Sequence, residues 1–142
     1  MSRFGTPLAA LRMRRAAWPL FRRPSSVPKA RSLVRTQLAR WGLAEQSDVA
    51  ELLVSELVTN ALRHAWGKPI LTLSAQNGTL RCEVADANPA LPHMSHAHYD
   101  DEGGRGLYLV DRLSCSWGSN RAPQGKVVWF ELSAHPKGRA HG

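Results

Sequence analysis

The stretch that most constrains the fold is Glu51 to Trp66, ELLVSELVTNALRHAW, which has the period of an amphipathic helix. At about 100° per residue, one face stays apolar throughout: Ala50, Val54, Leu57, Val58, Ala61 and Ala65. A neighbouring stripe begins with Val49, Leu52 and Leu53 and turns polar at Glu56, Asn60, Arg63 and His64. Since a polar sector must face water or a polar ligand, the stretch is either a solvated helix side or a packed helix that offers polar groups to a ligand.

Two pairs of segments show the alternation of β-strands. Residues 70–75 and 79–85 flank Asn77-Gly78, a strong hairpin turn, and place Leu80, Cys82 and Val84 on one buried face. Residues 114–119 and 127–133 predict a second hairpin, and residues 16–21 an edge strand that tolerates Pro19.

Helical spacing of apolar residues predicts a helix from Ser26, as N-cap, to a stop at Gly42. The long helix is expected to begin near Asp48, with a capping side chain, and to end at Gly67. The glycines at 103, 104 and 106 are expected to open a short helix through Leu113. Helices and hairpins in this order predict an α+β two-layer sandwich, with helices on one face of a mostly antiparallel mixed sheet.

Length and charge limit the domain organisation. A chain of 142 residues with 43% hydrophobic content forms one domain, which we place at residues 16–133 between a disordered basic arm, 1–15, and a disordered tail, 134–142. Residues 1–44 hold ten Arg or Lys and no acid. Such a segment can be a solvated arm or can dock an acidic protein, an anionic membrane or nucleic acid, but no nucleic-acid recognition motif accompanies it.

The compartment follows from what the sequence lacks. Cys82 and Cys115 have neither metal-site spacing nor a disulfide framework, and no apolar run is long enough to span a membrane, so a soluble cytoplasmic protein is expected. His93, His96 and His98 lie near three acids in a Pro-containing segment, and we interpret them as a polar loop rather than a metal site.

Four motifs occur in register: SELVTNALRHA with its E-x-x-x-N-A-x-x-H pattern, DANPALP after a strand, GGRGLYLV, and VVWFEL. Together they resemble the GHKL (histidine-kinase-like) superfamily of ATP-binding proteins, and most closely the small anti-sigma-factor serine/threonine kinases and their stand-alone relatives. The resemblance covers about residues 16–133 and implies a nucleotide held between the helices and the sheet.

The resemblance also implies roles for individual residues. Asn60 would bind Mg²⁺ through its amide oxygen, and Glu56, one turn earlier, would accept a proton from an attacking hydroxyl. Asp86 would accept the adenine amino hydrogen, with Asn88 and Pro89 shaping the turn below the ring. The remaining expected contacts to the nucleotide are Arg63, His64, Gly103, Gly104, Arg105, Gly106 and Leu107, the glycines bringing backbone N–H groups to phosphate at a helix N-terminus.

Two positions depart from the superfamily pattern. Many members have glycine where this chain has Asn88. Related sequences often have threonine where we align Val127, and that hydroxyl supports the adenine-binding aspartate directly or through water. Because valine cannot donate a hydrogen bond, either binding is weaker here or another group substitutes.

The preferred interpretation is an ATP- and Mg²⁺-dependent protein serine/threonine kinase that binds a sigma factor and phosphorylates an antagonist protein. The alternative is a nucleotide-binding regulatory module without phosphotransfer that docks a protein partner. A histidine kinase is disfavoured because no long helix with a phosphoacceptor histidine precedes the motifs. The sequence leaves the partner and the oligomeric state open, a homodimer included.

Overall fold

Nine elements make up the part of the chain that the computed structural model describes, which is residues 13–64, 67–88 and 102–134, with backbone alone at 64 and 102–107. In chain order they are β1 (Arg14–Pro19), α2 (Ser26–Arg40), the short 3-10 helix η1 (Ala44–Gln46), α3 (Ser47–His64), β2 (Ile70–Gln76), β3 (Thr79–Asp86), α4 (Glu102–Leu113), β4 (Ser116–Ala122) and β5 (Gly125–Ser133).

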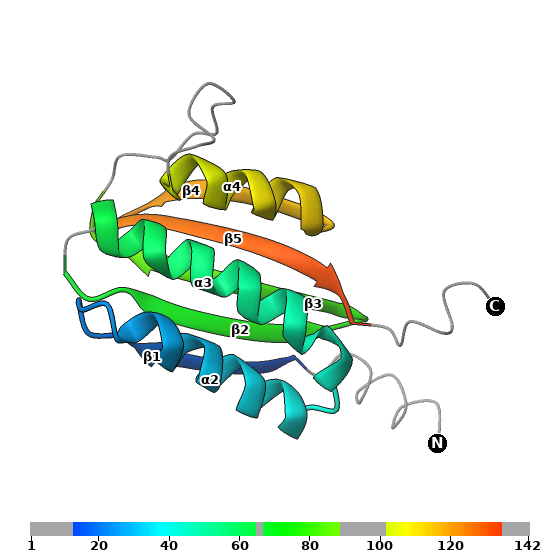
Figure 1. Ribbon diagram of the computed structural model, residues 1–142. Coiled ribbons are helices and arrows are strands. Elements are labelled where there is room, and N and C mark those ends of the chain that lie inside the picture. The colour runs from blue at the N-terminus through cyan, green and yellow to red at the C-terminus, as the bar shows by residue number, and fades with distance from the viewer. Residues whose placement is uncertain (1–12, 65–66, 89–101, 135–142) are drawn as a thin grey trace, which may run out of the picture.

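The strands form one sheet in the order β1-β2-β3-β5-β4, and all four described pairings are antiparallel. The three helices lie together on one face of this sheet, with α3 between α2 and α4 (Figure 1). The predicted α+β two-layer sandwich is therefore confirmed. Burial alternates along the central strands, since Leu80, Cys82 and Val84 of β3 are buried toward the helices while the residues between them are half-exposed.

The first hairpin forms as the turn residues predict. Asn77 and Gly78 both have positive φ, 54° and 79°, which is the backbone of a type I′ turn and matches the twist of the flanking strands. Its register pairs Leu73 with Cys82 and Leu71 with Val84. The apolar sides of β2 and β3 consequently meet on the helix-covered face.

The predicted N-cap of α2 needs correction by one residue, whereas the long helix begins next to Asp48 as expected. Ser25, not Ser26, is the N-cap of α2; Ser26 is the first helical residue, and its buried hydroxyl donates to the Phe21 carbonyl. Helix α3 begins at Ser47, directly after η1. The α2 helix stops where predicted, because Gly42 adopts the left-handed φ of 76° that favours glycine.

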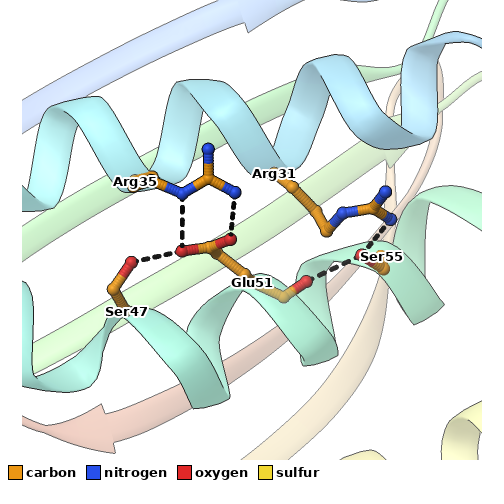
Figure 2. A network of polar contacts seen from close by, with 5 residues as sticks. All are labelled: Arg31, Arg35, Ser47, Glu51 and Ser55. Atoms are coloured by element: carbon orange, nitrogen blue, oxygen red, sulfur yellow. Dashed lines mark hydrogen bonds and ion pairs between the residues drawn. The ribbon is translucent and has the colours of Figure 1, made fainter.

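Helix α3 is held against α2 by a polar network that no local pattern predicted (Figure 2). Arg35 donates to both carboxylate oxygens of Glu51, at 2.7 and 3.3 Å, and the Ser47 hydroxyl donates to the same carboxylate. One turn further on, Arg31 reaches the Ser55 hydroxyl at 3.2 Å. Glu51 therefore links the two helices.

The second hairpin is also confirmed, with shifted bounds. Strand β4 begins at Ser116 because Ser114 still belongs to the end of α4, its backbone N–H donating to the Val110 carbonyl. At the other end of the chain, β1 begins at Arg14, so the last two residues of the predicted basic arm belong to the sheet. No helix in the described ranges is long and apolar enough to cross a membrane.

Candidate functional site

The elements that carry the predicted site residues meet at one end of the molecule. The last turn of α3, the end of β3, the start of α4 and the β4–β5 turn all lie at the left in Figure 1. Helix α3 contacts both α4 and β3. The fold thus brings together, as elements, the motifs that the sequence spreads over about half of the chain.

Helix α3 presents the two-faced surface that its sequence predicts. Its apolar face is buried in the core, at Ala50, Val54, Leu57, Val58 and Ala61. On the polar side, Glu56 is half-buried and Arg63 is exposed, whereas Asn60 is only 7% exposed. Burying an amide is costly unless its polar groups find partners, and no buried side-chain N or O atom in the described part of the chain lacks one. Asn60 is thus a buried amide on the polar side of this helix. His64 ends the helix, and its side chain lies outside the described residues.

Asp86 is the last residue of β3, and its side chain is 1% exposed. Its Oδ1 accepts a hydrogen bond from the backbone N–H of Asn88 at 2.8 Å, which closes a tight turn directly after the strand. The turn therefore forms with asparagine in the position where many GHKL proteins have glycine. Pro89 lies outside the described residues.

The group that supports Asp86 is Lys126, a residue that the sequence analysis did not select. The Lys126 ammonium lies 3.0 Å from Asp86 Oδ1 and 3.3 Å from the Asn88 carbonyl oxygen, and the lysine side chain is 2% exposed. Alternation along β5 could have identified it, because Lys126 shares its parity with the buried residues Val128, Phe130 and Leu132.

The expectation about Val127 is corrected by the strand register. Val127 pairs with Ala85, whereas Lys126 pairs with Asp86. Because neighbouring residues in a strand point to opposite faces, Val127 lies on the uncovered face of the sheet and could not support Asp86 whatever its side chain. The position that faces the aspartate is one residue earlier.

Gly125 allows β5 to start this close to Asp86. A Cβ at Gly125 would lie 1.9 Å from the Asp86 carbonyl oxygen and 2.6 Å from the Ala87 Cα, and the glycine φ is 152°. Contacts this short exclude any side chain at that position. The end of β3 and the start of β5 are therefore packed backbone to backbone beneath the Asp86–Lys126 pair.

Helix α4 begins at Glu102, which places Gly103, Gly104 and Gly106 in its first two turns and confirms that they open the helix. The side chains of Arg105 and Leu107 lie outside the description, as do residues 89–101 with their three histidines. Among the residues that are described, no cluster of His, Cys, Asp or Glu could hold a metal ion.

A hollow of about 340 Å³ adjoins the same strand ends. Asp86, Gly125 and Lys126 line it, together with Lys68, Ile70, Ala85, Ala87, Ala122, Pro123 and Gln124. The Asp86–Lys126 pair therefore borders a cavity at this end of the sheet.

Comparison with known proteins agrees with this geometry. Residues 21–132 match the family model of the histidine kinase-like ATPase domain. A search of curated proteins found no match.

Solved structures share the fold. The RsbU and RsbW domains of Rv1364c from Mycobacterium tuberculosis superpose with a TM-score of 0.66 at 16% identity, over 84% of this chain and 32% of that one. The histidine kinase domain of the blue-light activated kinase EL346 from Erythrobacter litoralis gives 0.51 at 24% identity, over 78% of this chain and 60% of that domain. This chain thus spans about a third of the first of these proteins. The family match over most of its length places the chain in the histidine kinase-like ATPase domain family.

Proposed function

We propose that the protein is an ATP-binding regulatory kinase of the anti-sigma type, which transfers the γ-phosphate of Mg·ATP to a serine or threonine hydroxyl of an antagonist protein. Membership of the ATPase domain family supports nucleotide binding, and the likeness to a structure that contains an RsbW domain supports the regulatory class. The single observation that carries the proposal is Asn60, an amide that is only 7% exposed although it lies on the polar side of α3.

The residues at this end suit the two charged parts of Mg·ATP. An amide oxygen is a hard ligand of the kind that Mg²⁺ takes, and Asn60 supplies one. The start of α4 directs backbone N–H groups outward at the positive end of the helix dipole, which favours phosphate. Arg63 is exposed one turn after Asn60 and adds a positive charge. His64, Asn88, Arg105 and Leu107 are further proposed nucleotide contacts. Asp86 is proposed to accept the adenine amino hydrogen.

Glu56 is proposed as the general base. It precedes Asn60 by four residues on α3, so both side chains project from the same side of the helix. A half-buried carboxylate next to the metal ligand can accept the proton of an attacking hydroxyl while bound Mg²⁺ neutralises charge on the phosphates.

The proposed partners are a sigma factor and its antagonist, and the surface offered to them is basic. Exposed cationic side chains gather on β1, the segment after it and α2: Arg14, Arg15, Arg22, Arg23, Lys29, Arg35 and Arg40. A surface of this sign favours an acidic protein segment and accelerates its association at low salt.

The test is phosphate transfer to a partner recovered by pull-down, followed with ATP labelled at the γ-phosphate. Wild type should label the partner, and Glu56→Ala should do so about two to four orders of magnitude more slowly while still binding ATP. Thr59→Ala, a substitution between the two site residues, serves as the control and should label at the wild-type rate. Labelling by Glu56→Ala at the wild-type rate would remove Glu56 from the chemistry. Absence of labelling by wild type would leave the non-catalytic binding module as the function.

A further inference from the structure

The Asp86–Lys126 pair has hydrogen-bonding capacity beyond the contacts within the chain. A lysine ammonium carries three N–H donors, and in the described part of the chain two of them are used, by Asp86 Oδ1 and by the Asn88 carbonyl. The hydrogen bonds that Asp86 accepts from described residues both end on Oδ1. One donor on Lys126 and one acceptor oxygen, Oδ2 of Asp86, therefore remain side by side.

We propose that Lys126 is a base-selecting residue of the nucleotide site, donating to N1 of adenine while Asp86 accepts from the 6-amino group. This inference rests on the proposed function, which places adenine at Asp86. The edge of adenine carries an N–H donor at position 6 next to an acceptor at N1, and this matches an acceptor and a donor held side by side. The ammonium also provides the support to Asp86 that a threonine hydroxyl provides in related sequences.

The same pair rejects the other common purine. Guanine and hypoxanthine carry an acceptor oxygen at position 6 and an N–H donor at N1. In the same pose, the oxygen would face the Asp86 carboxylate and the N1 hydrogen would face an ammonium that can only donate. Unpaired polar groups in a buried site are penalised more than a missing contact, so Lys126 adds to the selection of adenine.

The rigidity of the Asp86–Lys126 pair supports a role in selecting the base. Lys126 is anchored at both ends, by the β5 backbone beside Gly125 and by hydrogen bonds from its ammonium to two atoms of the β3 turn. Its side chain is 2% exposed, so few alternative rotamers are open to it. A donor held in one place before the ligand arrives discriminates more sharply than a mobile surface lysine.

The test compares ATP with 1-deaza-ATP, which has C–H in place of N1, in calorimetric titrations of the full chain with Mg²⁺. Wild type should bind 1-deaza-ATP about tenfold or more weakly than ATP, because a hydrogen bond from a charged donor is lost. Lys126→Met should bind both nucleotides with equal affinity, at or below the wild-type affinity for 1-deaza-ATP. Wild type should also bind inosine triphosphate at least tenfold more weakly than ATP.

Two control variants separate base selection by Lys126 from the general effects of removing a positive charge or of substituting a residue in β5. Lys68→Met removes a lysine at the same end of the molecule whose ammonium lies over the Phe21 ring. Val127→Thr introduces a hydroxyl one residue along β5, on the uncovered face. Both variants should keep the full difference between ATP and 1-deaza-ATP.

The outcomes distinguish this inference from the proposed function. If wild type binds neither nucleotide, nucleotide binding itself is refuted. If wild type binds ATP and 1-deaza-ATP equally, ATP binding stands, Lys126 does not contact N1, and the pair serves the β3–β5 turn alone. That comparison needs no variant, so it holds even if Lys126→Met fails to fold. Tighter ATP binding by Lys126→Met would also overturn the inference, since the ammonium would then block the base.

Discussion

Lys126 is a charged side chain in a place where charge is expensive. Removing an ion from water costs several kcal/mol, and attraction between partners offsets this only with good geometry and additional hydrogen bonds. Asp86 and Lys126 meet that condition, since they lie 3.0 Å apart and each makes a further bond in the turn that follows β3. Replacing one residue of the pair is therefore expected to destabilise the protein. Replacing both residues with apolar ones is expected to change its stability little.

Equilibrium unfolding in urea tests this expectation. Lys126→Met should lower the free energy of unfolding by about 3 to 5 kcal/mol, because it leaves the Asp86 carboxylate buried without its cation. Adding Asp86→Leu to that variant should recover part of the loss. If the double variant loses more free energy of unfolding than the two single variants lose together, Asp86 and Lys126 do not stabilise each other as a pair.

At the scale of elements, the α2–α3 junction depends on one carboxylate. Burial raises the pKa of Glu51, but hydrogen bonds from Arg35 and Ser47 and the charges of Arg35 and Arg31 outweigh it, so the pKa lies below its ordinary value. The Glu51 side chain is 14% exposed and that of Arg35 is 62% exposed. Because the Arg35 side chain is mostly in water, this ion pair is expected to contribute little to the free energy of unfolding.

The pH dependence of stability follows from the direction of that shift. A carboxyl whose pKa is lower in the folded protein contributes stability above its unfolded pKa, near 4.5, and loses it as pH falls through the folded pKa. Glu51→Gln should therefore be less stable than wild type at pH 7, with a difference that shrinks below about pH 4.5. Thermal unfolding of both proteins between about pH 4 and pH 7 measures this difference in stability. In an Arg35→Met background the same replacement should show a weaker pH dependence, and an unchanged one would contradict the role of the ion pair.

The β3–β5 junction depends on Gly125 for a steric reason. Gly125→Ala should lower the free energy of unfolding by about 3 kcal/mol or more, since its Cβ would meet the Asp86 backbone. Gly42→Ala is the matched control: Gly42 also has positive φ, but a Cβ there meets nothing within 4 Å, so only backbone strain of about 1 kcal/mol is expected. Chemical denaturation of both variants checks the difference, and equal losses would refute the steric argument.

Local chemistry explains which elements the sequence predicted well. The Asn77-Gly78 turn and the stop at Gly42 depend on φ values that few residues adopt, so composition identified them directly. The Glu51 network and the Lys126 support depend on partners 16 and 40 residues away, which no local pattern contains. Val127 was misassigned because a shift of one residue along a strand reverses the face of the sheet.

At the scale of the molecule, the hydrophobic periodicity of the sequence predicted the two layers of helices and sheet. The strand order explains why the end of α3, the end of β3 and the start of α4 lie at the same end of the molecule. The basic first third of the chain lies partly on β1 and α2, and Arg22 reaches the last turn of α3, where it donates to the Leu62 carbonyl. Docking through the residues before β1 should be separable from nucleotide binding.

Deletion of residues 1–12 checks that separation, because the cut leaves β1 intact from Arg14 onward. ATP affinity measured by calorimetry should be nearly unchanged. Binding of a protein partner should weaken, most clearly at low salt, because two cationic residues, Arg3 and Arg12, are lost. A fall in ATP affinity above about tenfold would show that this segment contributes to the nucleotide site.

The central claim is that the end of α3 holds Mg·ATP through Asn60, and its most direct test is titration of ATP into the protein with and without Mg²⁺. Wild type should release heat with a saturable isotherm that weakens when Mg²⁺ is removed. Asn60→Ala should bind at least about tenfold more weakly and should lose the Mg²⁺ dependence, with Thr59→Ala as the control that retains both. Equal affinity of wild type and Asn60→Ala, each with the same response to Mg²⁺, would contradict the account.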